Sequence, residues 1–161
     1  MSRAMWQGVF PAITTPFDTD GGVDHDFLAG HARRLVAAGS HGIVALGSLG
    51  EGATLNTAEK IAVLTTLVSA VGDRVPVVAG IASLATDDAV QLARAADKAG
   101  GRGLMVLPPY VHKGDWHETR THVSAIIEAT SLSCMLYNNP AAYGTDFLPE
   151  QVREFARHDN L

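Results

Sequence analysis

The sequence predicts an α/β fold with a parallel sheet, because short apolar runs alternate with longer helical patterns. Five runs are rich in Val, Ile, Leu and Ala and are apolar on both faces, which is typical of parallel strands buried on both sides. They occupy residues 9–13, 42–46, 75–79, 103–107 and 133–136. Strand and helix recur at intervals of roughly 30 residues, the usual size of a βα unit.

Each predicted strand is followed by a helical segment with its own start or stop signal. The segments span residues 24–38, 57–71, 86–99, 115–130 and 148–157. Asn56 or Thr57 provides an N-cap for the second segment, and Glu59 lies in its first turn. Pro149 suits the first turn of the last segment. Because no linker or composition break divides the chain, we expect a single domain over residues 1–161.

Composition and charge exclude several classes of protein. Of the 161 residues, 47% are hydrophobic and 18% charged, which provides for a buried core and excludes disordered and collagen-like chains. The formal net charge is −5 without a basic run, so we expect no nucleic-acid partner. Cys134 is the single cysteine, which favours a reducing, cytoplasmic setting. No apolar run approaches the roughly 20 residues of a membrane span, and we expect neither a membrane partner nor a secretion signal.

Ligands of parallel α/β folds bind at the carboxyl ends of the strands. After the second predicted strand, glycines flank Ser48 and Leu49 in the sequence GSLGEG. They permit a tight turn whose N–H groups point outward and bind a carboxylate or phosphate, with the Ser48 hydroxyl as a further donor. A plain strand-to-helix turn is an equal alternative at this point. The spacing matches neither a dinucleotide fingerprint, nor a P-loop, nor a nucleophile elbow.

Several other side chains are of types that take part in catalysis or metal binding, and the sequence pattern alone leaves their roles open. Tyr137 ends the fifth predicted strand, where a phenol transfers protons if a neighbour assists it, although packing is the commoner role. Tyr110 has the same status, and Glu51 is either a base or a helix cap. His117 and His122 stand five apart, which is wrong for paired metal ligands on one helix face, so we expect no metal.

Five segments together carry a family resemblance. They read GVFPAITTPF, GSLGEGATLNTAEK, VPVVAGIAS, GLMVLPPY and MLYNNPAAYG. In order and spacing they resemble the dihydrodipicolinate synthase / N-acetylneuraminate lyase family of class I pyruvate-type aldolases and lyases, over essentially the whole chain. The combination of G-S-x-G-E with L-Y-N-x-P is far more specific than either motif alone.

The resemblance implies a TIM barrel of eight parallel (β/α) units. About five of the eight are present in this chain, which is expected to stop before the sixth strand. The family forms a Schiff base between a lysine at the end of the sixth strand and the keto group of pyruvate or a related 2-keto acid. We therefore expect an aldolase, synthase or dehydratase that needs no cofactor, binds a small-molecule keto acid and assembles as a homotetramer or dimer.

The resemblance also assigns roles to residues. The backbone at Gly47, Ser48 and Leu49 would hold the substrate carboxylate. Tyr137 would be the general acid/base, and Ser48 would link it into a proton relay. Tyr110 corresponds to the family's relay tyrosine near a subunit interface.

Three departures from the family pattern qualify these expectations. Leu49 replaces the synthase's second hydroxyl residue, so only its backbone N–H serves. Ala142 stands where the synthase has an arginine for its second substrate, which favours a sugar-acid aldolase or dehydratase, or another pyruvate aldolase. None of Lys60, Lys98 and Lys113 matches the imine lysine, and we expect the chain alone to be inactive.

Two alternatives stay open. One is a non-catalytic 2-keto acid-binding or structural protein. The other is an unrelated doubly wound module, complete at this length, with helices on both faces of an open sheet. Five strands of a barrel leave two apolar edges, so we expect the isolated chain to aggregate or oligomerise.

Overall fold

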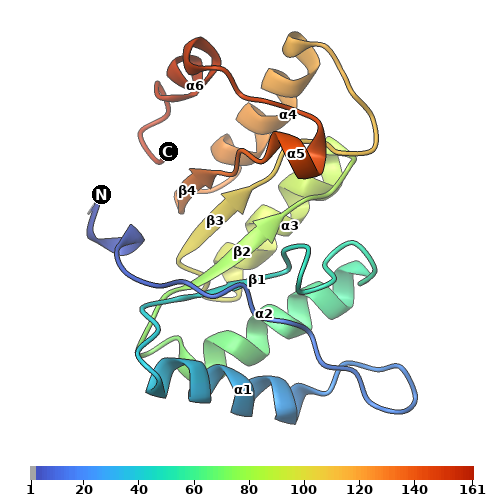
Figure 1. Cartoon of the computed structure of the whole chain (residues 1–161), viewed down its shortest axis with the longest axis vertical. Helices are drawn as coiled ribbons and strands as arrows, with labels where there is room; N and C mark the ends of the chain where they lie inside the picture. Colours follow the sequence, from blue (N-terminus) through green and yellow to red (C-terminus); the bar gives the residue numbers. More distant parts are fainter. Residues whose placement is uncertain (1–2) are drawn as a thin grey trace.

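The computed structural model describes residues 3–161 and contains a four-stranded parallel sheet. Its strands are β1 (Ile43–Ala45), β2 (Val77–Ile81), β3 (Gly103–Val106) and β4 (Ser133–Leu136), hydrogen bonded in that order. Ala79 of β2 pairs with Leu104 of β3, and Leu104 with Cys134 of β4. A helix joins each strand to the next, as predicted, so the chain builds the sheet one βα unit at a time (Figure 1).

The predicted helices are confirmed, with ends that differ by at most two residues. The helical elements are η1 (Arg3–Trp6), α1 (His25–Ala37), α2 (Thr57–Val71), α3 (Thr86–Lys98), α4 (Trp116–Glu128), α5 (Pro140–Tyr143) and α6 (Pro149–Phe155). Asn56 caps α2 by accepting from the Glu59 N–H, and the Glu59 carboxylate accepts from the Asn56 N–H. Among these helices of the described chain, none is long and apolar enough to span a bilayer.

The strand predicted at residues 9–13 is wrong in part, because only one residue of it forms a bridge. Ala12 pairs with Val44 in parallel, through Ile13 N–H to Val44 O (2.9 Å) and Val44 N–H to Pro11 O (3.0 Å). Pro11 has no N–H with which to continue the ladder toward Val9. The segment nevertheless lies beside β1, at the edge of the sheet (Figure 1).

The two faces of the sheet have different coverings. The large core joins one face to α1, α2, α3, α4 and α6, as shown by the buried residues Ile43, Leu67, Leu104, Ile126 and Phe155. The other face carries a separate apolar cluster, consisting of Val44, Val78, Met105 and Leu107 with partly buried Trp6, Phe10, Ala82, Met135, Tyr137 and Tyr143. We call this the inner face. Since the five longer helices all pack on the opposite side, the doubly wound alternative is wrong.

Candidate functional site

The turn after β1, residues 47–52, has an unusual backbone. Leu46 (φ 63°), just before the turn, and Glu51 (φ 52°), within it, both adopt the left-handed conformation, which side-chain-bearing residues rarely occupy. Three backbone hydrogen bonds close the turn: Gly50 N–H to Gly47 O (3.0 Å), Glu51 N–H to Ser48 O (3.1 Å) and Gly52 N–H to Gly47 O (3.3 Å). Within residues 3–161, the N–H groups of Ser48 and Leu49 donate no hydrogen bond. Two adjacent donors are therefore available to an anion.

Glycine is required at two positions of this turn. A Cβ on Gly52 would collide with the carbonyl of Leu46, and one on Gly50 would lie 2.9 Å from the carbonyl oxygen of Ile13. The Thr15 hydroxyl donates to the carbonyl oxygen of Gly50 (2.6 Å) and ties the turn to the N-terminal segment. These contacts fix the conformation of the turn by packing it against the N-terminal segment and against Leu46, which follows β1.

A cavity of about 510 Å³ lies between this turn and the inner face. Gly47, Ser48, Leu49 and Tyr137, all predicted as site residues, line it together with Tyr143. The other lining residues are Trp6, Gly8, Phe10, Ala12, Val44, Met105 and Met135. The cavity is thus largely apolar, and hydroxyl groups reach it from Ser48 and two tyrosines.

Tyr137 is placed on the inner face by the sheet. Its N–H donates to the carbonyl oxygen of Val106 (2.8 Å), which extends the β3–β4 pairing by one residue beyond β4. The side chain is half-buried, and its hydroxyl oxygen accepts from Asn139 Nδ2 (3.3 Å). The Tyr137 and Tyr143 rings meet edge to face, with centroids 6.0 Å apart.

Tyr143 belongs to the site but does not belong to the set predicted from the sequence. It ends α5, and its hydroxyl forms a hydrogen bond with the hydroxyl of Ser48. Asn139 caps α5 by accepting from the Ala142 N–H (3.2 Å), Pro140 occupies the first turn, and Gly144 (φ 69°) ends the helix. This Asn-Pro start and Gly stop are the signals that could have revealed the short helix.

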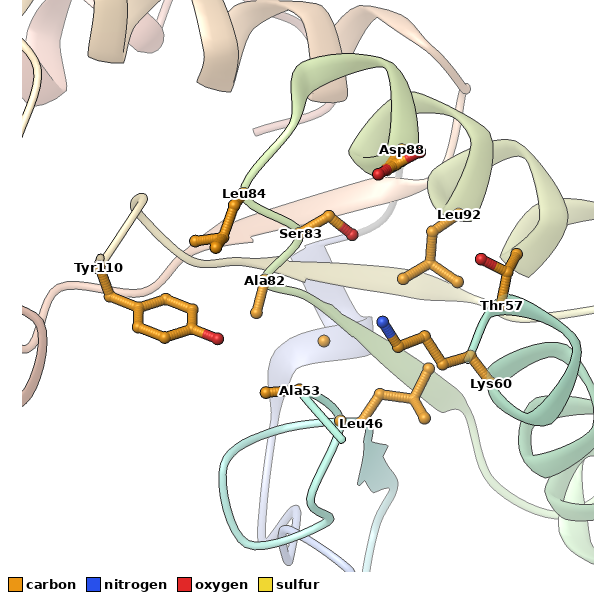
Figure 2. A pocket seen from close by; sticks show the side chains of 12 residues that line it. Leu46, Ala53, Thr57, Lys60, Ala82, Ser83, Leu84, Asp88, Leu92 and Tyr110 are labelled. Atoms are coloured by element: carbon orange, nitrogen blue, oxygen red, sulfur yellow. The ribbon is translucent and has the colours of Figure 1, made fainter. Parts of the chain in front are cut away.

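Tyr110, also predicted as a site residue, contacts Tyr143 but lines a different pocket. Its ring packs edge-on against Tyr143, with centroids 5.9 Å apart. The neighbouring pocket, of about 190 Å³, lies among the loops that follow β1, β2 and β3 (Figure 2). Lys60 and Asp88 are its charged lining residues, and the Lys60 ammonium group points into it (Figure 2).

Comparison with known proteins decides the family. The model of the dihydrodipicolinate synthetase family matches residues 5–161. The chain belongs to the dihydrodipicolinate synthetase family. It is 40% identical over 161 residues to the 4-hydroxy-tetrahydrodipicolinate synthase of Natronomonas pharaonis, covering 100% of this chain and 54% of that protein. A synthase of the same name from Haloarcula marismortui is 38% identical, with 52% of its length covered.

Solved structures agree on the fold. The dihydrodipicolinate synthase of Bacillus anthracis superposes with a TM-score of 0.91 at 33% identity, over 95% of this chain and 52% of that one. A prophage protein of the family from E. coli K12, in complex with pyruvate, gives a TM-score of 0.90 at 31% identity, over 95% and 51%. The chain therefore spans about half the length of its relatives, and its fold is the predicted partial TIM barrel.

The three lysines of the chain do not belong to the lining of the 510 Å³ cavity. Lys60 lines the pocket beside it, and Lys98 is in the last turn of α3. The side chain of Lys113 covers Gly144, where an added Cβ would lie 2.8 Å from Lys113 Cε. None of the three lines the cavity that holds Ser48 and Tyr137.

The remaining candidate residues, Glu51, His117, His122 and Cys134, do not line the 510 Å³ cavity. The Glu51 side chain is exposed, and His117 is exposed on α4. His122 is buried and hydrogen bonds to the Thr86 hydroxyl (2.9 Å), and burial lowers its pKa. Cys134 is buried in β4, and burial raises the pKa of its thiol to about 12. Over residues 3–161, no three His, Cys, Asp or Glu side chains gather around a common point.

Proposed function

We propose that this protein is a Schiff-base-forming lyase acting on pyruvate or a related 2-keto acid, as an aldolase, synthase or dehydratase. The observation that carries the proposal is the single cavity shared by the free N–H groups of the 47–52 turn and the Tyr137 side chain. The E. coli K12 relative in complex with pyruvate supports the keto acid as ligand. The protein acts in the cytoplasm, as a homo-oligomer and without a cofactor.

The carboxylate of the keto acid binds at the 47–52 turn. It accepts hydrogen bonds from the N–H groups of Ser48 and Leu49, which have no other partner among the described residues. Bonds to a charged acceptor contribute about 1.5–3 kcal/mol each. The Leu49 side chain has no donor and is 66% exposed, so its contribution to binding comes from the backbone.

Tyr137 donates a proton to the keto oxygen during imine formation. When an amine adds to the keto carbon, the oxygen must gain protons and depart as water before the imine exists. The Tyr137 hydroxyl, half-buried on the wall of the cavity, donates and recovers such a proton. Ser48 and Tyr110 are the further relay hydroxyls of this proposal, although the Ser48 hydroxyl bonds to Tyr143 in the structure and the Tyr110 ring packs against Tyr143.

The chain alone forms no imine, because none of Lys60, Lys98 and Lys113 lines the cavity. The missing amine comes from the barrel units that this chain does not contain. Ala142 stands at the position where the synthase has an arginine for its second substrate, so the second substrate has no arginine partner here. This favours sugar-acid or other pyruvate chemistry over the synthase reaction.

Borohydride trapping with pyruvate tests the proposal. In the 161-residue chain, mass spectrometry should find no reduced adduct. In a chimera where this chain replaces the matching part of the Natronomonas pharaonis synthase, an adduct should form on a lysine of the synthase portion. A folded chimera without an adduct, when the parent synthase forms one, would contradict the proposal. Saturable pyruvate binding by that chimera without an adduct would favour a non-catalytic keto acid-binding protein instead.

A further inference from the structure

All three tyrosines of the chain gather in one cluster beside the 47–52 turn. Tyr143 is its centre, since its ring contacts Tyr110 on one side and Tyr137 on the other. It is also the tyrosine whose hydroxyl bonds to Ser48, whereas the Tyr137 hydroxyl bonds to Asn139. The partner of Ser48 is therefore a residue that the family motifs quoted above leave without a role.

We infer that Tyr143 is the proton partner of Ser48, supplied by the same chain. This inference rests on the proposed function, because the proton it moves belongs to the bound keto acid. Ser48 gives its hydroxyl proton to an oxygen of the ligand and takes the proton of Tyr143 at the same time. One proton passes from the phenol to the ligand, and the reverse transfer restores it.

The contacts of α5 support a chemical role for Tyr143 in addition to packing. Ser48 is exposed and has water available, yet its hydroxyl pairs with the phenol of Tyr143. Asn139 connects α5 to the acid/base tyrosine, because its Oδ1 caps the helix and its Nδ2 donates to the Tyr137 hydroxyl. A shift of α5 would therefore disturb the hydroxyl groups of both Ser48 and Tyr137. Tyr143 itself lines that cavity, so a ligand there would touch it.

Labelling with [13Cζ]tyrosine tests the inference, because the chain gives only three signals and each Tyr→Phe variant assigns one. Ser48→Ala should move the Tyr143 signal, and Ser48→Thr, which keeps the hydroxyl, should restore it. Ser69→Ala removes an exposed hydroxyl on α2 and should leave all three signals in place. Pyruvate should move the Tyr143 signal, and Tyr143→Phe, which keeps the ring, should weaken pyruvate binding roughly fivefold to tenfold.

The outcomes separate the two proposals. If Ser48→Ala leaves the Tyr143 signal in place, the pairing is absent and the inference is overturned. If the wild-type chain and Tyr143→Phe bind pyruvate equally well, the inference is overturned while the proposed function stands. If the wild-type chain does not bind pyruvate, both fail, and any remaining link between Ser48 and Tyr143 is structural only.

Discussion

The hydroxyl groups of Ser48 and Tyr143 form a hydrogen bond although 95 positions separate the two residues. Ser48 follows β1 and Tyr143 follows β4, and these strands stand at opposite ends of the sheet order. Neighbouring strands lie about 4.8 Å apart, so a flat sheet would separate β1 from β4 by about 14 Å. The loops after the two strands therefore converge over the inner face, where they close the cavity that we assign to the keto acid.

Replacing Gly52 by alanine should destabilise the protein and disrupt the 47–52 turn. The added Cβ would collide with the Leu46 carbonyl, and we expect a loss of about 2–4 kcal/mol in the free energy of unfolding. Urea unfolding measures this loss. Gly30→Ala in α1 is the matched control, because its Cβ would meet only the end of Arg34, and it should be neutral or stabilising by up to about 1 kcal/mol. Equal effects of the two substitutions would refute the steric account.

Acid should destabilise the fold through His122. Burial lowers the pKa of His122 below its ordinary value of 6.5, so below this pH the unfolded chain binds a proton that the folded chain resists. The free energy of unfolding therefore falls as the pH drops from about 7.5 to about 5.5. His122→Gln should reduce this pH dependence in urea unfolding, whereas His117→Gln, on the exposed side of α4, should not. An unchanged pH dependence in His122→Gln would contradict the assignment.

The Cys134 thiol should be unreactive in the folded protein. Its pKa is raised to about 12 by burial, so very little thiolate exists near neutral pH, and the sulfur is also inaccessible. A thiol reagent such as dithionitrobenzoate should label it rapidly in urea and slowly without urea. Rapid labelling of the folded chain would show that β4 opens readily at this edge of the sheet.

Asn139 should couple α5 to Tyr137. Asn139→Asp keeps the cap on the Ala142 N–H but loses the donor to Tyr137, so it should move the [13Cζ] signal of Tyr137 and change stability little. Asn139→Ala loses both contacts and should also cost about 1 kcal/mol in the free energy of unfolding. If Asn139→Asp left the Tyr137 signal in place, the hydrogen bond between the two side chains would be ruled out.

Much of this fold could be predicted from local pattern, because its helices and strands have strong periodicity and caps. The capping box of Asn56 and Glu59 is an example in which the sequence signal and the structure coincide. The segment at residues 9–13 has the apolar composition of a strand, but Pro11 removes the N–H that a longer ladder needs. Composition alone therefore overestimates pairing at this edge.

The site was harder to predict, because its defining contacts join distant segments. The motifs identify Ser48, Leu49 and Tyr137 one at a time, and the structure places all three on one cavity. Tyr143 was missed because α5 has only four residues, too few for a periodic pattern, and because its partner is a residue of another loop. The left-handed conformation of Leu46 was likewise hidden, since it is imposed by the packing of the turn.

The most direct test of the central claim is a pyruvate titration of the 15N-labelled chain, followed at the backbone amides of Ser48 and Leu49. We predict saturable shifts of these two signals, because we propose that the carboxylate binds their N–H groups. Acetone, which has the keto group without the carboxylate, should cause no such shifts. Signals of Ser48 and Leu49 that stay in place while pyruvate is added to saturation, or that respond equally to acetone, would contradict the account.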